Sequence, residues 1–354
     1  MQADRSRSLF HRAWLILAAL CLVGGPASRV MGAEDPDEEL LQGKTVKQWI
    51  ELFAHEDDET RDEAIEAVLE AGPDAVRDIV TTCARYGDRL YSGKFVEYTD
   101  AEWNQLDALD EAIFELGSEA TPELAELLSD KSAYVRASAA AYLSTLGPDG
   151  RAALPHLRKA LGDKNEHVRD LAASALGEIG SAALEAKPEL GKLLVDPSPL
   201  VRISAALALW LMDEDERAVP TLIRHLEDRN DFTRAYAANA VGSMGKDALA
   251  ALPTLKRRLN EKIPHVRYAM AAAVWDVEQE DSAMSVAVEL LSAREAFIRE
   301  SAAALLGEME SRAKSTIPAL RVLVEKDKSR RVRSTARKAI ESIKAGPSVE
   351  SPVT

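Results

Sequence analysis

The sequence contains few cysteines and few aromatic residues, and each shortage excludes a class of protein. Two of the 354 residues are cysteines, Cys21 and Cys83, and only 5% are aromatic. Because Cys21 lies in an N-terminal apolar stretch, neither a disulfide framework nor a cysteine-based metal site is expected. Cys83 lies in an apolar helical run and is predicted to be a small buried side chain. Alanine and leucine dominate instead, which favours closely packed helices.

Motifs that carry chemistry are also lacking. The sequence has no His-Glu-x-x-His, no glycine-rich phosphate loop and no Gly-x-Ser-x-Gly elbow. His167 and His265 each stand two residues before an arginine in a predicted turn, and we expect both to face solvent. We therefore predict a non-catalytic protein with no metal and no cofactor.

The first 33 residues resemble an export signal. Arg5, Arg7 and Arg12 precede an uncharged run of 11 residues, 13–23, which is followed by glycine, proline and small residues. This run has about half of the ~20 residues that span a bilayer as a helix. We expect an exported protein, located in the periplasm, at the cell surface or in the medium. Retention of the segment as a membrane anchor is the alternative.

Charge is unevenly distributed along the chain. Residues 34–130 contain 28 acidic and 7 basic residues, a net charge of −21, whereas residues 131–354 contain 30 acidic and 33 basic residues, a net charge of +3. An acidic chain repels phosphate backbones, so we expect no nucleic-acid partner. The acidic third is interpreted as a solvated face.

A repeat of 32 to 34 residues runs through the chain from about residue 119. Its most regular member is an arginine, which usually follows valine or isoleucine and stands at Arg136, Arg169, Arg202, Arg234, Arg267, Arg299 and Arg333. A proline precedes most of these arginines by 14 residues and predicts the start of a first helix. Apolar residues at helical spacing around the arginine predict a second helix, which a glycine in the left-handed conformation often ends.

An acidic residue occupies a fixed position in the turn between the two helices. Six residues before the arginine stand Asp130, Asp163, Asp196, Asp228, Glu261 and Asp327. Such an acid can cap the second helix and accept hydrogen bonds from an arginine of the same or an adjacent repeat. We expect a structural ladder of these pairs. The repeat with Ala293 in this position also lacks the proline, which predicts a weaker joint.

The pattern Pro-x-Leu-x-x-x-Leu, Asp, Val-Arg-x-x-Ala-x-x-Ala-Leu-Gly resembles HEAT repeats, specifically the phycobilisome-lyase HEAT-like subgroup. The resemblance implies an all-α fold, an α-solenoid with a right-handed superhelix of about nine helical hairpins. The predicted organisation is a signal peptide (1–33), an acidic flexible lead (34–43), N-terminal HEAT-like units (44–118) with an insertion at 87–99, seven HEAT-like repeats (119–345) and a disordered tail (346–354).

Two irregular features are candidates for partner binding. The insertion carries Tyr91, Phe95 and Tyr98, which either bind a partner or fill a gap as a satellite cluster. The second feature lies eight residues after the arginine, where most repeats have a small residue but two have Trp210 and Trp275. In HEAT-like stacks this face lines the concave side.

Three further side chains are expected to share the face of the two tryptophans, namely Ile203, Leu207 and Tyr268. Together they would flank a groove above Ala235, Asn239 and Gly242 that holds an extended segment or a helix of a partner. Packing of the rings against adjacent helices is the alternative.

The leading hypothesis is an exported, non-catalytic scaffold or adaptor, monomeric, that binds a protein or peptide. The resemblance leaves a HEAT-like enzyme of the bilin-lyase or di-iron hydroxylase type as an alternative. The single His-Glu pair in the sequence, His55-Glu56, does not support the hydroxylase. An accessory module of a cell-surface assembly is the third possibility.

Overall fold

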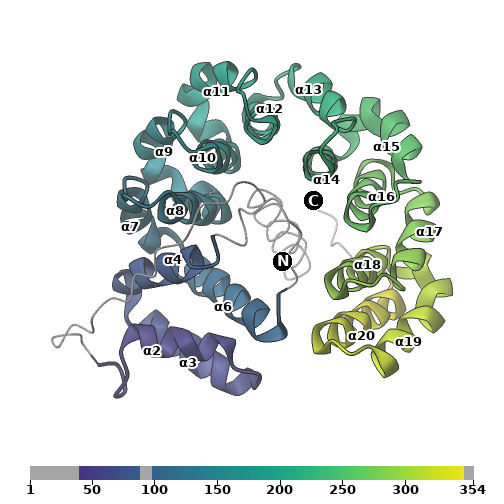
Figure 1. Ribbon diagram of the computed structural model, residues 1–354, viewed down its shortest axis with the longest axis horizontal. Helices are drawn as coiled ribbons and strands as arrows, with labels where there is room; N and C mark the ends of the chain where they lie inside the picture. The colour runs from purple at the N-terminus through teal and green to yellow at the C-terminus, as the bar shows by residue number, and fades with distance from the viewer. Residues whose placement is uncertain (1–39, 88–97, 347–354) are drawn as a thin grey trace, which may run out of the picture. The chain divides into compact units, whose positions relative to one another are not determined.

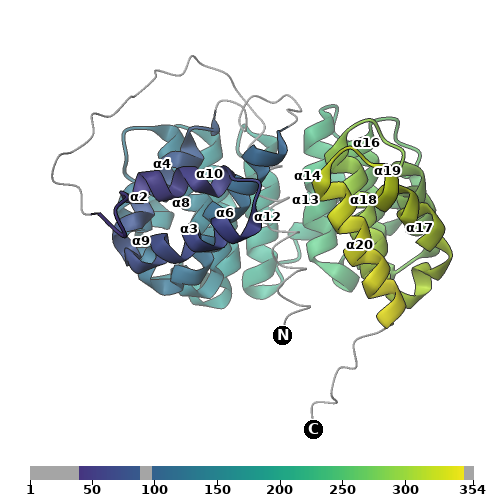
Figure 2. The ribbon, with the colours of Figure 1, turned by 90° about the horizontal axis from the view of Figure 1, so that it is seen from below.

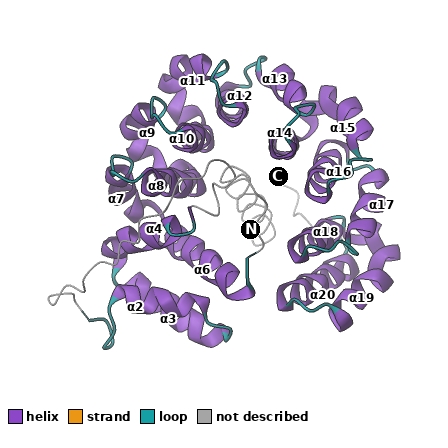
Figure 3. Cartoon of the chain, in the orientation of Figure 1, coloured by secondary structure: helices purple, strands orange, loops and turns teal. Residues whose placement is uncertain are grey.

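The structure is a computed structural model that describes residues 40–87 and 98–346. These residues form helices, short 3-10 turns and loops, with no strand among them (Figure 3). An isolated bridge between Leu41 and Lys44 precedes the first helix. The prediction of an all-α solenoid of HEAT-like hairpins is confirmed.

The chain divides into two compact units at Thr221 and Leu222, and each is described by itself. The described residues of the first unit form five helical pairs: α2 (Val46–Glu51) with α3 (Asp58–Glu70), α4 (Val76–Ala84) with α6 (Asp100–Leu116), α7 (Thr121–Leu127) with α8 (Ala133–Leu146), α9 (Leu154–Ala160) with α10 (Glu166–Ile179), and α11 (Lys187–Leu193) with α12 (Pro199–Asp213). The division itself falls inside α13 (Ala218–His225).

The second unit continues the same alternation of first and second helices. It contains α14 (Asp231–Ser243), then α15 (Leu252–Arg258) with α16 (Pro264–Glu278), α17 (Asp281–Leu290) with α18 (Ala296–Glu308), and α19 (Ile317–Lys326) with α20 (Arg330–Ala345). In both units the second helices form one layer and the first helices another (Figure 1). The turned view shows α18 and α20 lying alongside each other (Figure 2).

Local sequence accounts for the ends of these helices. Proline is the second residue of α7, α9, α11, α15 and α19, where a missing N–H costs no hydrogen bond. Gly147 and Gly180 end α8 and α10 with φ of 55° and 71°. Their ψ values, −125° and −141°, lie outside the left-handed helical region that we expected. Glycine adopts this positive-φ backbone most readily, so the residue type is right and the conformation differs.

The core lies between the two layers of each unit. Val135, Ala139, Tyr142 and Leu146 of α8 are all less than 9% exposed, as the helical spacing predicts. In α20 the corresponding face is buried as well. Alanine is frequent in this core, so the second helices approach each other closely.

Candidate functional site

The repeat arginines and acids form the predicted ladder, in which four arginines pair with the acid of the following repeat: Arg136, Arg169, Arg234 and Arg299. Arg136 donates from Nε and Nη2 to the two carboxylate oxygens of Asp163, at 2.8 and 2.9 Å. Arg169 does the same to Asp196, at 2.9 and 2.8 Å. Such two-pronged pairs fix orientation as well as distance. The ladder therefore sets the register between neighbouring repeats.

The same side chains hold the turn of their own repeat. Arg136 Nη1 donates to the backbone carbonyls of Asp130 and Lys131 at 2.9 and 3.3 Å. The carboxylate of Asp163 accepts from the N–H of Asn165 at 2.8 Å. Burial opposes ionisation of Asp163, but the hydrogen bonds from Arg136 and the backbone outweigh it, so the pKa of this carboxyl lies below its usual value.

In the second unit one arginine of the ladder pairs with an acid outside the turn. Arg299 donates to both oxygens of Asp327 at 2.6 and 2.9 Å, as in the regular repeats. Arg267 faces the repeat that has Ala293 in place of the acid, and it donates instead to Glu289 at 2.6 Å and to the carbonyl of Leu259 at 2.9 Å. Helix α16 also packs much less extensively on α18 than α18 does on α20. This agrees with the weaker joint that the sequence predicts.

The predicted concave groove is wrong in one respect, because four of its five flanking side chains are buried. Ile203, Leu207, Tyr268 and Trp275 are 0%, 7%, 8% and 5% exposed, and Trp210 is half-buried. The ring of Trp275 instead lies 5.0 Å from the guanidinium carbon of Arg312. Packing of the rings within the protein, the alternative reading, describes these four residues better. Trp210 belongs to the first unit and Trp275 to the second.

The small residues at the eighth position after the repeat arginine have a packing role. A Cβ on Gly177 would lie 2.8 Å from Ala208 Cα, and one on Gly307 would lie 3.0 Å from Ala339 Cα. A Cβ on Gly242 would meet Asp276 Oδ2 at 2.8 Å. The eighth position after the arginine therefore faces the second helix of the next repeat. Small side chains stand there because the two backbones approach closely.

The aromatic insertion is only partly inside the described residues. Tyr91 and Phe95 lie outside them. Tyr98 is 7% exposed and packs edge-on against Tyr86 and Trp103, with ring centroids 6.1 and 5.1 Å apart. For Tyr98 the satellite cluster is the correct interpretation, since its ring is enclosed by its neighbours.

The histidines that we expected to face solvent are buried. His167 and His265 are 4% and 9% exposed. The ring of His265 stacks on Phe232 at 5.1 Å, and burial lowers the pKa of this imidazole. The expectation was wrong because a turn in a stacked repeat is covered by the turns beside it. No group of His, Cys, Asp and Glu in residues 40–87 and 98–346 has the arrangement of a metal site.

Cys83 is buried, as predicted. Burial, followed by the neighbouring charge of Asp110, raises the pKa of its thiol to about 11. Burial, followed by the charge of Asp107, raises the pKa of Asp110 itself to about 8. A thiol with so high a pKa stays protonated at neutral pH and does not provide a thiolate nucleophile.

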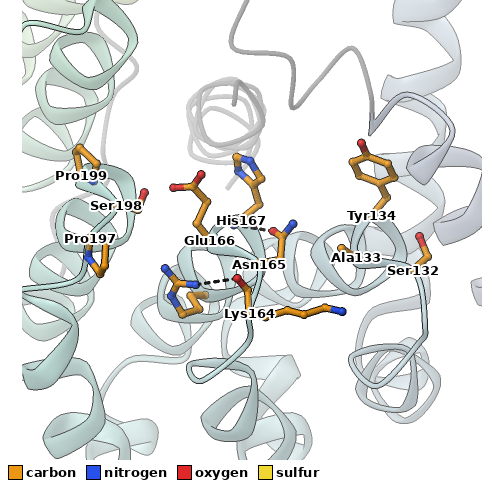
Figure 4. A pocket seen from close by; sticks show the side chains of 11 residues that line it. Ser132, Ala133, Tyr134, Lys164, Asn165, Glu166, His167, Pro197, Ser198 and Pro199 are labelled. Atoms are coloured by element: carbon orange, nitrogen blue, oxygen red, sulfur yellow. Dashed lines mark hydrogen bonds between the residues drawn. The ribbon is translucent and has the colours of Figure 1, made fainter. Parts of the chain in front are cut away.

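An open groove of about 750 Å³ runs across three successive turns of the first unit. We call it the turn-edge groove; its walls are Ser132, Ala133 and Tyr134, then Lys164, Asn165, Glu166, His167 and Arg169, then Pro197, Ser198 and Pro199. These residues surround the N-termini of α8, α10 and α12 (Figure 4). The sequence reasoning missed this groove, although the signal was present in the turn residues that repeat beside the ladder acids.

The helix ends in the turn-edge groove differ in how they are capped. The Asn165 side chain accepts from the backbone N–H groups of His167 and Val168 at 2.9 and 3.3 Å, which caps α10. Ser132 and Ser198 make no such bond to α8 and α12, and neither helix has an acid in its first turn. The first-turn N–H groups of α8 and α12 therefore have no side-chain acceptor. The carboxylates of Asp130 and Asp196 accept from the N–H groups of Ser132 and Ser198, just before these helices, at 2.7 and 2.8 Å.

Comparison with known proteins agrees with this architecture. Residues 121–190 and 187–275 match the family model described as HEAT repeats. A search of curated proteins gives no match. No helix of the described segments is long and apolar enough to cross a bilayer.

Solved structures with a similar fold include three examples. An engineered protein is 21% identical, with 97% of this chain and 96% of that chain covered and a TM-score of 0.37. The CpcE–CpcF complex of phycocyanin lyase from Nostoc is 25% identical, with 63% and 94% covered and a TM-score of 0.44. Human deoxyhypusine hydroxylase is 22% identical, with 77% and 97% covered and a TM-score of 0.34. Residues 121–275 are HEAT repeats by the match to the family model, and the other described residues continue the same alternation of first and second helices.

Proposed function

We propose that this protein is a non-catalytic scaffold that binds a protein partner along the turn edge of its repeats. The observation that carries the proposal is the turn-edge groove, which three successive repeats build together. The ladder holds the turns on both sides of it through the pairs of Arg136 with Asp163 and Arg169 with Asp196. A binding surface on such a rigid frame loses little conformational entropy when a partner binds.

The groove has the mixed character of a protein-binding surface. The ring of Tyr134 and the prolines Pro197 and Pro199 offer apolar contacts at its two ends. Lys164 and Glu166 offer charge between them. Aromatic and aliphatic surface next to polar groups is typical of interfaces that release their partner.

Site-specific photo-crosslinking tests the proposal. A photoreactive phenylalanine analogue in place of Tyr134, in the full-length protein in its native host, is expected to form an adduct with a partner protein that mass spectrometry identifies. The matched control carries the analogue at Leu184, which is 43% exposed and lies in the 3-10 segment Gly180–Ala186 of the same unit. Equal yields of the same adduct at both positions, or no adduct at Tyr134, would refute the proposal.

We also propose that residues 1–33 direct export. This rests on the positive residues and the short apolar run of the sequence. Cell fractionation, with N-terminal sequencing of the mature chain, tests it. A chain that keeps its N-terminus and stays in the cytosol would contradict it.

A further inference from the structure

We infer that the turn edge binds an acidic, extended segment of a protein. This deepens the proposed function and rests on it, since it names the chemistry of the partner. It is carried by three features: a row of exposed cations, the two helix ends that no side chain caps, and one buried hydroxyl group.

One exposed cation follows the ladder position in almost every repeat. The first unit has Lys131 and Lys164 in this place, and the second unit has Arg229, Lys262, Arg294 and Lys328. All six are exposed, and none takes part in an ion pair among the described residues. Pro197 is the exception among the seven turns. An otherwise acidic chain thus carries an exposed cation outside any ion pair in six of these seven turns.

The ladder fixes the backbone beneath these cations. The carbonyls of Lys131 and Lys164 accept from Arg136 and Arg169 at 3.3 and 3.4 Å. In the second unit the carbonyls of Arg294 and Lys328 accept from the arginines of their own repeats at 2.8 and 2.9 Å. Neighbouring helices pack about 8–10 Å apart. The cations of one unit are therefore presented at the spacing of the repeat.

In the turn-edge groove one of these cations, Lys164, lies among helix ends that have no side-chain cap. Helices α8 and α12, of 14 and 15 residues, have neither a side-chain cap nor an acid in the first turn. Glu166 lies in the first turn of α10, the helix that Asn165 already caps. The places left for an anionic group are thus at α8 and α12, on either side of Glu166.

A buried hydroxyl points to a ligand independently of the helix ends. Ser198 is 4% exposed, and its Oγ has no hydrogen-bond partner. In Figure 4 this hydroxyl points from its own turn toward the turn of Lys164, Asn165 and Glu166. A buried hydroxyl without a partner costs about 1–3 kcal/mol. A carboxylate oxygen from a bound segment would supply the missing acceptor.

The spacing favours a peptide over a nucleic acid. An extended segment in the polyproline II conformation has three residues per turn and rises about 3.1 Å per residue, so every third side chain recurs on the same face at about 9 Å. This matches the spacing of about 8–10 Å between neighbouring packed helices. Among the residues that line the turn-edge groove, Tyr134 is the only phenylalanine, tyrosine or tryptophan. The groove therefore has no row of aromatic side chains on which successive bases could stack.

Fluorescence anisotropy with defined peptides tests the inference. The probe is a labelled 13-residue peptide with glutamate at every third position and glycine or serine between. We expect saturable binding that weakens as salt is raised, with at least tenfold weaker binding of the peptide in which glutamine replaces glutamate. Lys164→Glu is expected to weaken binding of the glutamate peptide about tenfold and Ser198→Ala about threefold.

The matched control is Arg151→Glu, which makes the same change of charge at an exposed position of the 3-10 segment Gly147–Ala153 in the same unit. It is expected to leave binding within twofold of the wild type. Three outcomes would overturn the inference. The glutamate and glutamine peptides could bind equally well, or Arg151→Glu could weaken binding of the glutamate peptide as much as Lys164→Glu does. A twelve-nucleotide oligothymidine could also bind more tightly than the glutamate peptide. A partner adduct at Tyr134 without binding of the glutamate peptide would refute this inference and leave the scaffold function standing. If neither the adduct at Tyr134 nor binding of the glutamate peptide is found, the scaffold function and this inference are both refuted.

Discussion

Two neighbouring joints in the second unit show what makes one repeat stack firmly on the next. Between α18 and α20, Arg299 clasps Asp327 through two hydrogen bonds, and Gly307 lets the helices approach until a Cβ would lie 3.0 Å from Ala339 Cα. These two devices occur together with an extensive contact between the helices.

Between α16 and α18 both devices are missing. Ala293 replaces the ladder acid, and Trp275 replaces the small residue. Arg267 turns to Glu289, whose side chain is 61% exposed, and the contact between the helices is much smaller. Trp275, which breaks the repeat pattern, thus marks a joint of the second unit where the stack is spaced differently. The helix that carries the other tryptophan, α12, is the last second helix before the division into two units.

The largest difference between the joints is expected from removal of an arginine. Arg299→Met leaves the carboxylate of Asp327, whose side chain is 4% exposed, without its charged partner. We expect the free energy of unfolding to fall by about 3 kcal/mol. Arg267→Met is the matched control and is expected to cost about 1 kcal/mol or less, because Glu289 remains solvated. Urea unfolding followed by circular dichroism measures both, and equal losses would show that the two rungs do not differ.

The close approach of helices is expected to produce the second largest effect. Gly307→Leu places a side chain against the backbone of α20, which cannot move without separating the helices. We expect a loss of about 2 kcal/mol. Gly191→Leu in α11 is the control, because the nearest atom to its Cβ is the flexible Arg217 guanidinium at 3.6 Å. A stability for Gly307→Leu equal to that of the control would contradict the packing role of the eighth position.

The rung between Arg299 and Asp327 also predicts a dependence on pH. Burial disfavours the charged form of Asp327, but the hydrogen bonds from Arg299 and from the N–H of Ser329 outweigh burial and lower its pKa. A carboxyl with a lowered pKa in the folded state contributes stability above its unfolded pKa and loses it as pH falls through the folded pKa. The difference in stability between the wild type and Arg299→Met should therefore shrink to about half or less on going from pH 7 to pH 2. A difference that stays constant over this range would show that the ion pair is not its source.

These joints also show which parts of the structure could be predicted from the sequence. Proline, aspartate, arginine and glycine each satisfy a local requirement at a fixed spacing, so the helical pairs and the ladder follow from their positions. The pattern left open whether Arg136 pairs within its own repeat or with the next, because both acids stand at suitable distances along the chain. Only the packed helices show that Asp163, not Asp130, receives the two side-chain hydrogen bonds.

The candidate site was predicted less well, for a physical reason. A helical wheel separates the core face of α16 from its opposite face, and Trp275 was placed on the opposite face. In a stack, a second helix also buries the side that meets the next repeat, so less of its surface is free than the wheel indicates. The turn edge stays open, and its signal is the exposed basic residue after each ladder position, such as Lys164 or Lys262.

Repair of the weak joint is expected to have the smallest effect. Ala293→Asp restores the acid where Arg267 could reach it, but Arg267 already has Glu289 as a partner and Trp275 still stands between the helices. We expect a gain of about 0.5 kcal/mol, seen as a slightly higher urea midpoint with an unchanged slope. A gain as large as the loss in Arg299→Met would mean that the acid alone sets the strength of a joint. The expected gain of about 0.5 kcal/mol would show instead that Trp275, at the eighth position, limits the strength of this joint. A charge pair holds two repeats firmly only where small residues already let their helices approach each other.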